Sequence, residues 1–113
     1  MPDGAWAKEL RAAITVCDRE GVALEMNDRA ASTFEKDGGR ELIGKSLLDC
    51  HPGRARALFA ELLRTGGTNV YTIEKDGVKK LIYQAPWYEG GEYRGIVELS
   101  LPIPVEVPHF VRS

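Results

Sequence analysis

One cysteine and one histidine lie side by side near the middle of the chain, within residues 44–53. Cys50 and His51 are residue types that supply a nucleophile and a general base, or ligands for a metal ion. Adjacent residues rarely face each other, however, and we identify no third group that would orient them as a catalytic pair. The sequence also has no paired carboxylates, phosphate-binding loop or Walker motif. We therefore predict no catalytic residue and no enzymatic activity.

Cys17 and Cys50 are the two cysteines of the chain, and they form neither a metal-binding spacing nor a disulfide framework. We expect free thiols and no metal site. For Cys50 we weigh a small buried apolar residue against a thiol whose pKa is lowered, and we favour the first. For His51 we favour a loop histidine that bonds to the backbone over a ligand-binding imidazole.

The composition is that of one globular domain. The chain has 113 residues, of which 43% are hydrophobic and 28% charged, with a net charge of -2. No lysine and arginine cluster indicates nucleic-acid binding, and no apolar run approaches the length of a membrane span. No signal peptide is apparent, so we expect a cytoplasmic protein that binds neither nucleic acids nor membranes.

Local patterns in the first half predict helices around a β-hairpin. Trp6, Leu10 and Ala13 have helical spacing, which predicts an N-terminal helix within residues 1–12, capped by Asp3. Two strands follow, joined by a turn that ends at Gly21. Short helices come next. We expect Asn27 to be the N-cap of one of them. Ser46 should cap another, which carries the apolar residues Leu47 and Leu48.

The second half contains the clearest helix and a three-stranded meander. Apolar residues at i, i+3, i+4 and i+7 predict an amphipathic helix after Pro52 that ends at Gly66, and they are Ala55, Leu58, Phe59 and Leu62. Strands are predicted over residues 69–75, 79–87 and 93–101. In the middle strand the alternation separates Tyr83 from Ile82, and we expect Tyr83 to face the core side of the sheet.

These elements predict an α+β fold with a five-stranded antiparallel sheet. Short helices and one longer helix should cover one face of the sheet, and a further helix should precede it. We divide the chain into an N-terminal helix and dimerisation segment (1–12), the domain itself (13–102) and an extended C-terminal tail (103–113), which Pro102, Pro104 and Pro108 keep from regular structure.

The order of elements resembles a PAS domain, and the resemblance covers most of residues 14–101. It is carried by Ile14-Thr15-Val16-Cys17-Asp18 with Gly21 and Asn27, by Ala30, Ala31 and Phe34, by Leu42-Ile43-Gly44-Lys45, and by Gly91 with Gly95-Ile96-Val97. The resemblance implies a sensory or protein-interaction module of signal transduction that holds small molecules between sheet and helices and dimerises. A signalling protein is then a further possible partner.

Known cofactors of such domains match this sequence poorly. In the flavin-binding branch the reactive cysteine lies three residues after the position that resembles Gly44, which here is Leu47; Cys50 comes three residues too late. Heme-binding members use a histidine on the longer helix, whereas His51 precedes that helix. The cofactor stays unknown, and a heme sensor that uses His51 is an alternative.

From the predicted faces we expect one cavity between sheet and helices. Its lining should contain His51 and Tyr83 as polar contacts, together with the apolar or aromatic residues Phe34, Ile43, Leu47, Leu48, Leu58, Leu62, Tyr71 and Ile73. Large apolar residues on the outer sheet face favour a homodimer. The alternative is a dimerisation scaffold with a filled core and no ligand.

Overall fold

A computed structural model describes residues 4–51 and 53–113. In chain order its elements are α1 (Ala5–Lys8), β1 (Ala13–Cys17), β2 (Ala23–Met26), α2 (Asp28–Thr33), the 3-10 turns η1 (Glu35–Asp37), η2 (Gly39–Leu42) and η3 (Leu47–Cys50), α3 (Gly53–Thr65), β3 (Asn69–Lys75), β4 (Val78–Glu89) and β5 (Glu92–Ile103). The predicted α+β class and the order of elements are confirmed. The expected cap Asp3 and the helix-starting Pro52 lie outside the described residues.

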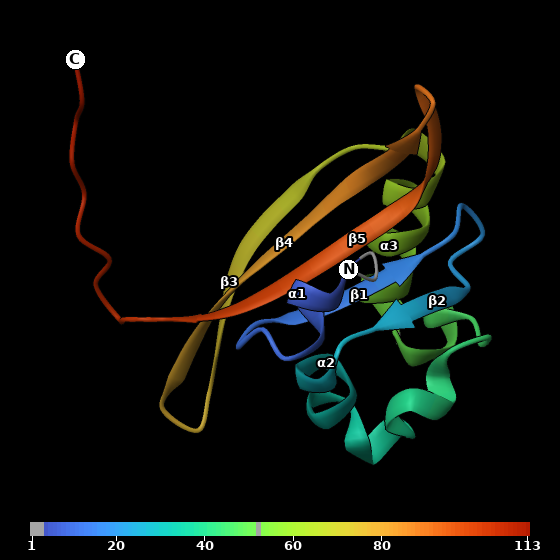
Figure 1. Ribbon diagram of the computed structural model, residues 1–113, viewed down its shortest axis with the longest axis horizontal. Helices are drawn as coiled ribbons and strands as arrows, with labels where there is room; N and C mark the ends of the chain where they lie inside the picture. The colour runs from blue at the N-terminus through green and yellow to red at the C-terminus, as the bar shows by residue number, and fades with distance from the viewer. Residues whose placement is uncertain (1–3, 52) are drawn as a thin grey trace.

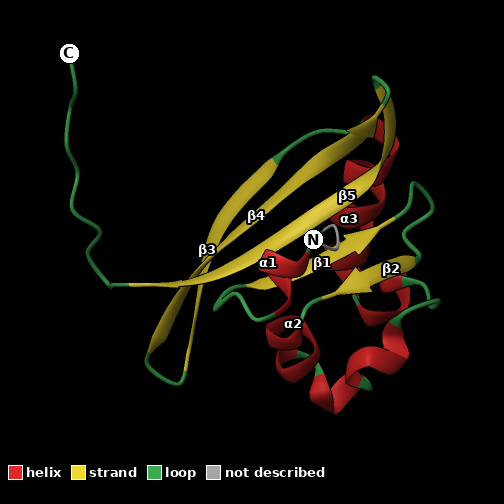
Figure 2. Cartoon of the chain, viewed as in Figure 1, coloured by secondary structure: helices red, strands yellow, loops and turns green. Residues whose placement is uncertain are grey.

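The five strands form one antiparallel sheet in the order β2-β1-β5-β4-β3. The longer helix α3 lies on one side of this sheet and α1 on the other (Figure 1). The C-terminal segment after β5 leaves the body as an extended chain (Figure 2). We call the side of the sheet that carries α3 the inner face and the opposite side the outer face.

Short-range hydrogen bonds start the helices where the sequence predicts. The Asn27 side chain accepts from the Ala30 N–H and caps α2, and the Ser46 hydroxyl accepts from the Leu48 N–H and caps η3. Asn27 also accepts from the Ile14 N–H and donates to the carbonyl oxygens of Ala7 and Ala12. This buried amide therefore connects the N-terminal segment, β1 and α2.

Two predicted boundaries are wrong. The N-terminal helix ends at Lys8 and does not continue towards residue 12, because a helix this short is marginal alone. At the other end, β5 continues through Pro102 to Ile103. Strand β1 pairs with β5 only as far as Ser100, so Pro102 lies where β5 has no neighbour on that side and its missing N–H costs no ladder bond.

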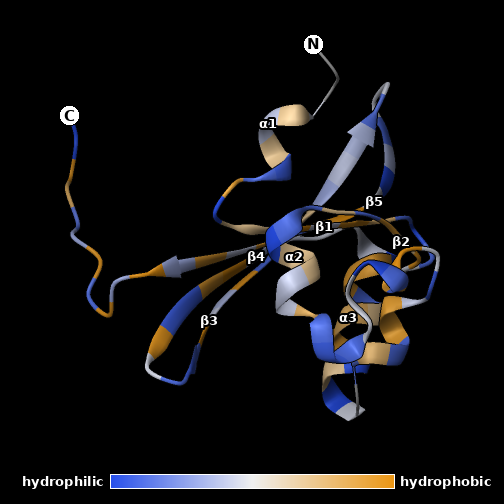
Figure 3. Cartoon of the chain, turned by 60° about the horizontal axis from the view of Figure 1, so that its bottom comes forward, coloured by the Kyte–Doolittle hydropathy of each residue, from blue (hydrophilic) through white to orange (hydrophobic). Residues whose placement is uncertain are grey.

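Helix α3 closes the core over the inner face. The main cluster of buried residues consists of Cys17, Phe59, Leu62, Leu63 and Ile96. Polar and apolar residues alternate along α3 (Figure 3), as expected for a helix with one buried side. Leu58 is 56% exposed, so the buried stripe consists of Phe59, Leu62 and Leu63 rather than the predicted set.

Gly95 allows β5 to pass close to the end of β1. A Cβ at this position would overlap the carbonyl oxygen of Cys17 and would lie 2.8 Å from the Asp18 Cα. The Trp87 indole N–H donates to the same Cys17 carbonyl at 2.9 Å, and Trp87 is paired with Gly95. Only glycine fits this contact, which explains its place in the resemblance.

The predicted faces of β4 are reversed. Ile82 and Gln84 are buried on the inner face, whereas Tyr83 is 40% exposed. Tyr83 pairs with Leu99 and Val70, so it lies on the outer face with them. Alternation separates the two faces of a strand but does not say which faces the helices, and here the more apolar set faces outward.

Candidate functional site

A cavity of about 90 Å³ lies between the inner face and the helical segments. Strands β1, β2 and β5 supply one wall, and α3 and the segment from Phe34 to His51 supply the other. Most of the lining is apolar or aromatic, and it includes the polar residues Thr15, Asp37 and Glu98. An apolar cavity with a few polar groups is the usual form of a small-molecule site.

Polar side chains cross the inner face in one row. Asn69, Gln84, Glu98 and Thr15 are successive partners on four neighbouring strands. Asn69 Nδ2 donates to Gln84 Oε1 at 3.3 Å, and Gln84 Nε2 donates to Glu98 Oε1 at 2.8 Å. Gln84 is 5% exposed. Because this donor is buried, its hydrogen bond fixes the position of the Glu98 carboxylate.

The ring of His51 separates the cavity from a second, more open groove. His51 and Phe59 line both spaces, and their rings stack with centroids 5.0 Å apart and 14° between their planes. His51 Nδ1 lies 2.6 Å from the Leu47 carbonyl oxygen. A carbonyl oxygen only accepts, so Nδ1 carries the proton in that bond and Nε2 of the neutral ring is an acceptor.

The predicted site residues fall into four groups. Phe34, Leu47 and His51 line the cavity, while Leu58 and Tyr71 line the groove with His51. Leu62 and Leu48 belong to the packed core. Ile43, Ile73 and Tyr83 are each 40% exposed or more and line neither space. For Tyr83 the reason is the reversed face of β4. Ligand binding by any of them stays a prediction.

Several cavity residues are absent from the predicted set. Thr15 and Cys17 come from β1, Glu98 and Ile96 from β5, and Met26 from β2. The alternation in the first and last strands marks these residues as one face of each strand, but the polar Thr15 and Glu98 make that face resemble a solvent-facing one. Only the pairing of β1 with β5 places them together beneath the helices.

Neither thiol is activated. Cys50 is exposed, but partial desolvation of its thiol raises its pKa above the ordinary value. The charges of Asp37 and Asp49 raise this pKa further, and the charge of Lys45 opposes them with a smaller effect. Burial raises the pKa of Cys17 to about 11. The alternative of a lowered-pKa thiol at Cys50 is therefore wrong. The favoured prediction of a buried apolar residue is also wrong, because Cys50 is exposed. The described residues contain no group of three or more potential metal ligands.

The inner cavity does not fit a heme. The cavity beside it holds about 90 Å³, well below the ~300 Å³ at which sites for larger organic ligands begin. The imidazole lies flat against Phe59 and its Nδ1 is engaged by the Leu47 carbonyl oxygen. A porphyrin needs more space than this cavity provides, and heme ligation by His51 from the side of the groove stays a prediction.

Comparison with known proteins agrees with this architecture. A sequence profile described as the PAS fold matches residues 8–67, more than half of the chain. The chain belongs to the PAS fold family. The resemblance noted in the sequence is confirmed, and this PAS domain is a sensory or interaction module of signal transduction, a class that is generally non-catalytic.

Solved PAS structures share the fold at low sequence identity. The PAS domain of BvgS from Bordetella pertussis has a TM-score of 0.61 and 22% identity, covering 86% of this chain and 80% of that chain. The Aer2 receptor of Vibrio cholerae, described as a dual PAS-heme oxygen sensor, has a TM-score of 0.60 and 16% identity, covering 82% and 95%.

A sensory box histidine kinase from Vibrio cholerae gives a TM-score of 0.63 and 15% identity, with 88% of each chain covered. At these identities the likeness shows the fold alone. No curated protein matches the sequence. No helix in residues 4–51 and 53–113 is long and apolar enough to cross a membrane.

Proposed function

We propose that this PAS domain is a non-catalytic cytoplasmic sensor that binds a small molecule in the inner cavity and passes the signal to a partner protein. The observation that supports this most is the row of polar side chains on the inner face, which brings the Glu98 carboxylate and Thr15 into a cavity whose lining is mostly apolar or aromatic. A row that served packing alone would be expected to be apolar, because buried polar groups add little stability.

The size of the cavity limits the ligand. An apolar cavity of ~150 Å³ holds benzene, so a cavity of about 90 Å³ suits a smaller molecule. The competing hypothesis is a scaffold with a filled core that binds no ligand. Under that hypothesis, ordered water would occupy this space. Isobutanol, which combines a compact apolar body with one hydroxyl, is a suitable probe.

Methyl NMR tests the site directly. Titration with isobutanol should shift the methyl signals of Leu42, Leu47 and Ile96, which line the cavity. Leu47→Trp should abolish these shifts by filling the cavity. The matched variant Leu58→Trp changes an exposed groove residue and should preserve them. Unshifted cavity methyls at saturating probe would contradict ligand binding and favour the scaffold.

The outer face supports a second proposal, a homodimer. Ile14, Leu99, Tyr83 and Val70 form a row across four strands, and all four are apolar or aromatic and at least partly exposed. Trp6 of α1, on the same side of the sheet, is 68% exposed. A contiguous apolar surface of this kind is typical of an interface. Sedimentation equilibrium should give the mass of a dimer, and a monomer at every concentration would contradict it.

A further inference from the structure

Two carboxylates line the cavity, and among the charges that act on Cys50 at its wall the opposing charge of Lys45 has the smallest effect. The carboxylates are those of Asp37 and Glu98, and the lining contains no lysine or arginine. The nearby guanidinium groups are engaged elsewhere: Arg40 donates to the Met26 carbonyl oxygen and the Asp28 carboxylate, and Arg56 to the Leu48 carbonyl oxygen and the Asp49 carboxylate. In so small a space this imbalance disfavours an anionic ligand.

Effects on neighbouring acids agree with this sign of charge. After burial, the charge of Glu98 is the next cause that raises the pKa of Tyr71, and it also contributes to the raised pKa of Cys17. The charge of Asp37 contributes likewise at Cys50. Each of these groups is harder to deprotonate because carboxylates lie close to it.

The cavity also presents several hydrogen-bond acceptors. Glu98 Oε1 accepts from Gln84, which leaves acceptor capacity on both carboxylate oxygens. Thr15 is 5% exposed and lines the cavity, and its hydroxyl oxygen can accept as well as donate. Nδ1 of His51 is engaged by a carbonyl oxygen, so the neutral ring offers an acceptor at Nε2. Phe34 and Phe59 add aromatic rings that attract cations.

We propose that the ligand of the inner cavity is a small cationic amine, whose ammonium group donates to Glu98 and Thr15 while its apolar body contacts Phe34, Leu47 and Phe59. This inference rests on the proposed ligand-binding function and adds the chemical class of the ligand. An ammonium fits because it carries only donors, and the cavity supplies the acceptors and the charge.

Three probes with the same four-carbon skeleton but different charge test the proposal on the full chain. Isobutylamine is a cation near neutral pH, isobutanol is neutral and isobutyrate is an anion. Methyl shifts of Leu42, Leu47 and Ile96 report binding in the cavity. Isobutylamine should bind at least tenfold more tightly than isobutanol, and isobutyrate should not bind.

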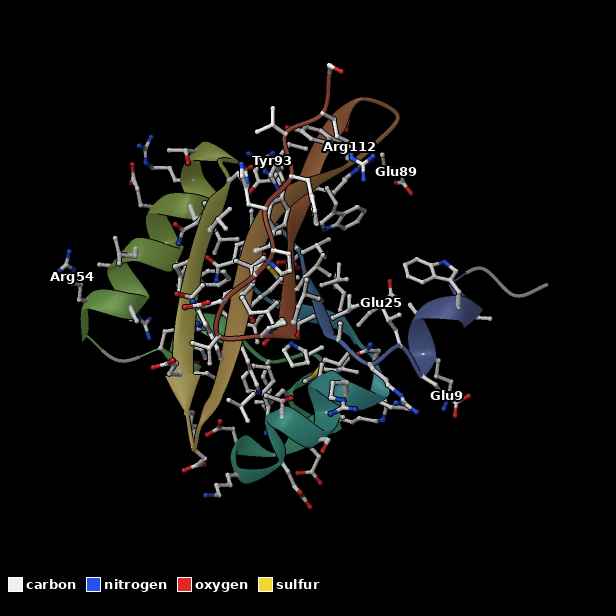
Figure 4. All side chains as sticks on the ribbon, turned by 90° about the vertical axis from the view of Figure 1, so that its left-hand side faces the viewer. Glu9, Glu25, Arg54, Glu89, Tyr93 and Arg112 are labelled. Atoms are coloured by element: carbon white, nitrogen blue, oxygen red, sulfur yellow. The ribbon has the colours of Figure 1, made fainter. Side chains whose placement is uncertain are left out.

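The variant Glu98→Gln isolates the charge. Its amide oxygen still accepts from Gln84, so the polar row is retained, and the affinity for isobutylamine should fall at least tenfold while that for isobutanol stays within about twofold. The matched control is Glu25→Gln. Glu25 is exposed on β2 and lies on the side of the sheet opposite α3 (Figure 4), so this variant should bind like the parent chain.

The outcomes separate the two proposals. Binding of isobutanol or isobutyrate at least as tight as that of isobutylamine, or an unchanged isobutylamine affinity in Glu98→Gln, would overturn the amine assignment and leave the ligand-binding function in place. Failure of all three probes to shift the cavity methyls would overturn both.

Discussion

At one level across the sheet, the inner and outer faces reverse the usual pattern, although apolar residues such as Cys17 and Ile96 form the core elsewhere on the inner face. On the inner face, Thr15, Glu98, Gln84 and Asn69 form a polar row beneath the helices, with Thr15 and Gln84 each only 5% exposed. The neighbouring residue on each of these strands points to the outer face. Together these neighbours form an apolar row, and all are at least partly exposed: Ile14, Leu99, Tyr83 and Val70.

This reversal indicates what each face does. Buried polar groups need partners and gain little stability over apolar packing, so the inner row is better explained by recognition than by stability. Exposed apolar groups gain stability when they are covered, so the outer row is better explained by association. A domain that served packing alone would show the opposite distribution.

The largest effect is expected at Gly95, on which both faces depend because it brings β5 against the end of β1. Gly95→Ala should lower the free energy of unfolding by at least about 3 kcal/mol, since the new methyl meets rigid backbone at Cys17 and Asp18. Chemical denaturation measures this. The control is Gly91→Ala. Gly91 has a positive φ of 84°, but a Cβ there would meet no neighbouring atom within 4 Å. This variant should lower the free energy of unfolding by about 1 kcal/mol. Equal costs would disprove the role of the close contact.

A pair of substitutions on adjacent residues of β4 compares the faces directly. Gln84→Leu removes the partner of Glu98 on the inner face and should lower the free energy of unfolding by about 1–3 kcal/mol. Tyr83→Leu on the outer face should change it by no more than about 0.5 kcal/mol. Equilibrium denaturation of both variants provides the comparison, and a smaller loss for Gln84→Leu would show that the polar row is not a structural unit.

Charge on the outer face should affect association and little else. Tyr83→Lys places a cation in the centre of the apolar row on each copy, which should weaken a dimer at least tenfold in sedimentation equilibrium while the melting temperature of the monomer is preserved. Val78→Lys adds the same charge at the exposed start of β4, and its dimer should be unaffected. Unchanged association in Tyr83→Lys would place the interface elsewhere.

At neutral pH the smallest effect concerns the two thiols. Cys50 is exposed at the cavity wall and Cys17 is buried on the inner face. Because both pKa values are raised, iodoacetamide should modify Cys50 slowly below pH 9 and leave Cys17 of the folded protein unmodified. Rapid alkylation of Cys50 at pH 7 would contradict this.

The same raised pKa makes stability depend on pH. Folding keeps Cys17 protonated up to about pH 11, whereas the unfolded thiol ionises near its ordinary value of 9.0. The unfolded state therefore binds fewer protons between these values, and the free energy of unfolding should fall as the pH rises from about 9 to about 11. Denaturation curves of Cys17→Ala should lack this part of the decline.

Local interactions explain what the sequence determined by itself. The caps at Asn27 and Ser46, the turn at Gly21 and the end of α3 before Gly66 depend on residues a few positions apart, and all were predictable. Together with Gly95 they were enough to identify a five-stranded antiparallel sheet and the PAS family.

Only the tertiary structure decided which face of the sheet lies under the helices. Period-two alternation is the same for both faces, and the more apolar face of β4 was a natural choice for the core. Strand pairing instead places Gln84, Glu98 and Thr15 next to one another on the inner face. It places Tyr83 on the outer face. These contacts join residues that are up to about 80 positions apart, and no local pattern encodes which strand lies next to which.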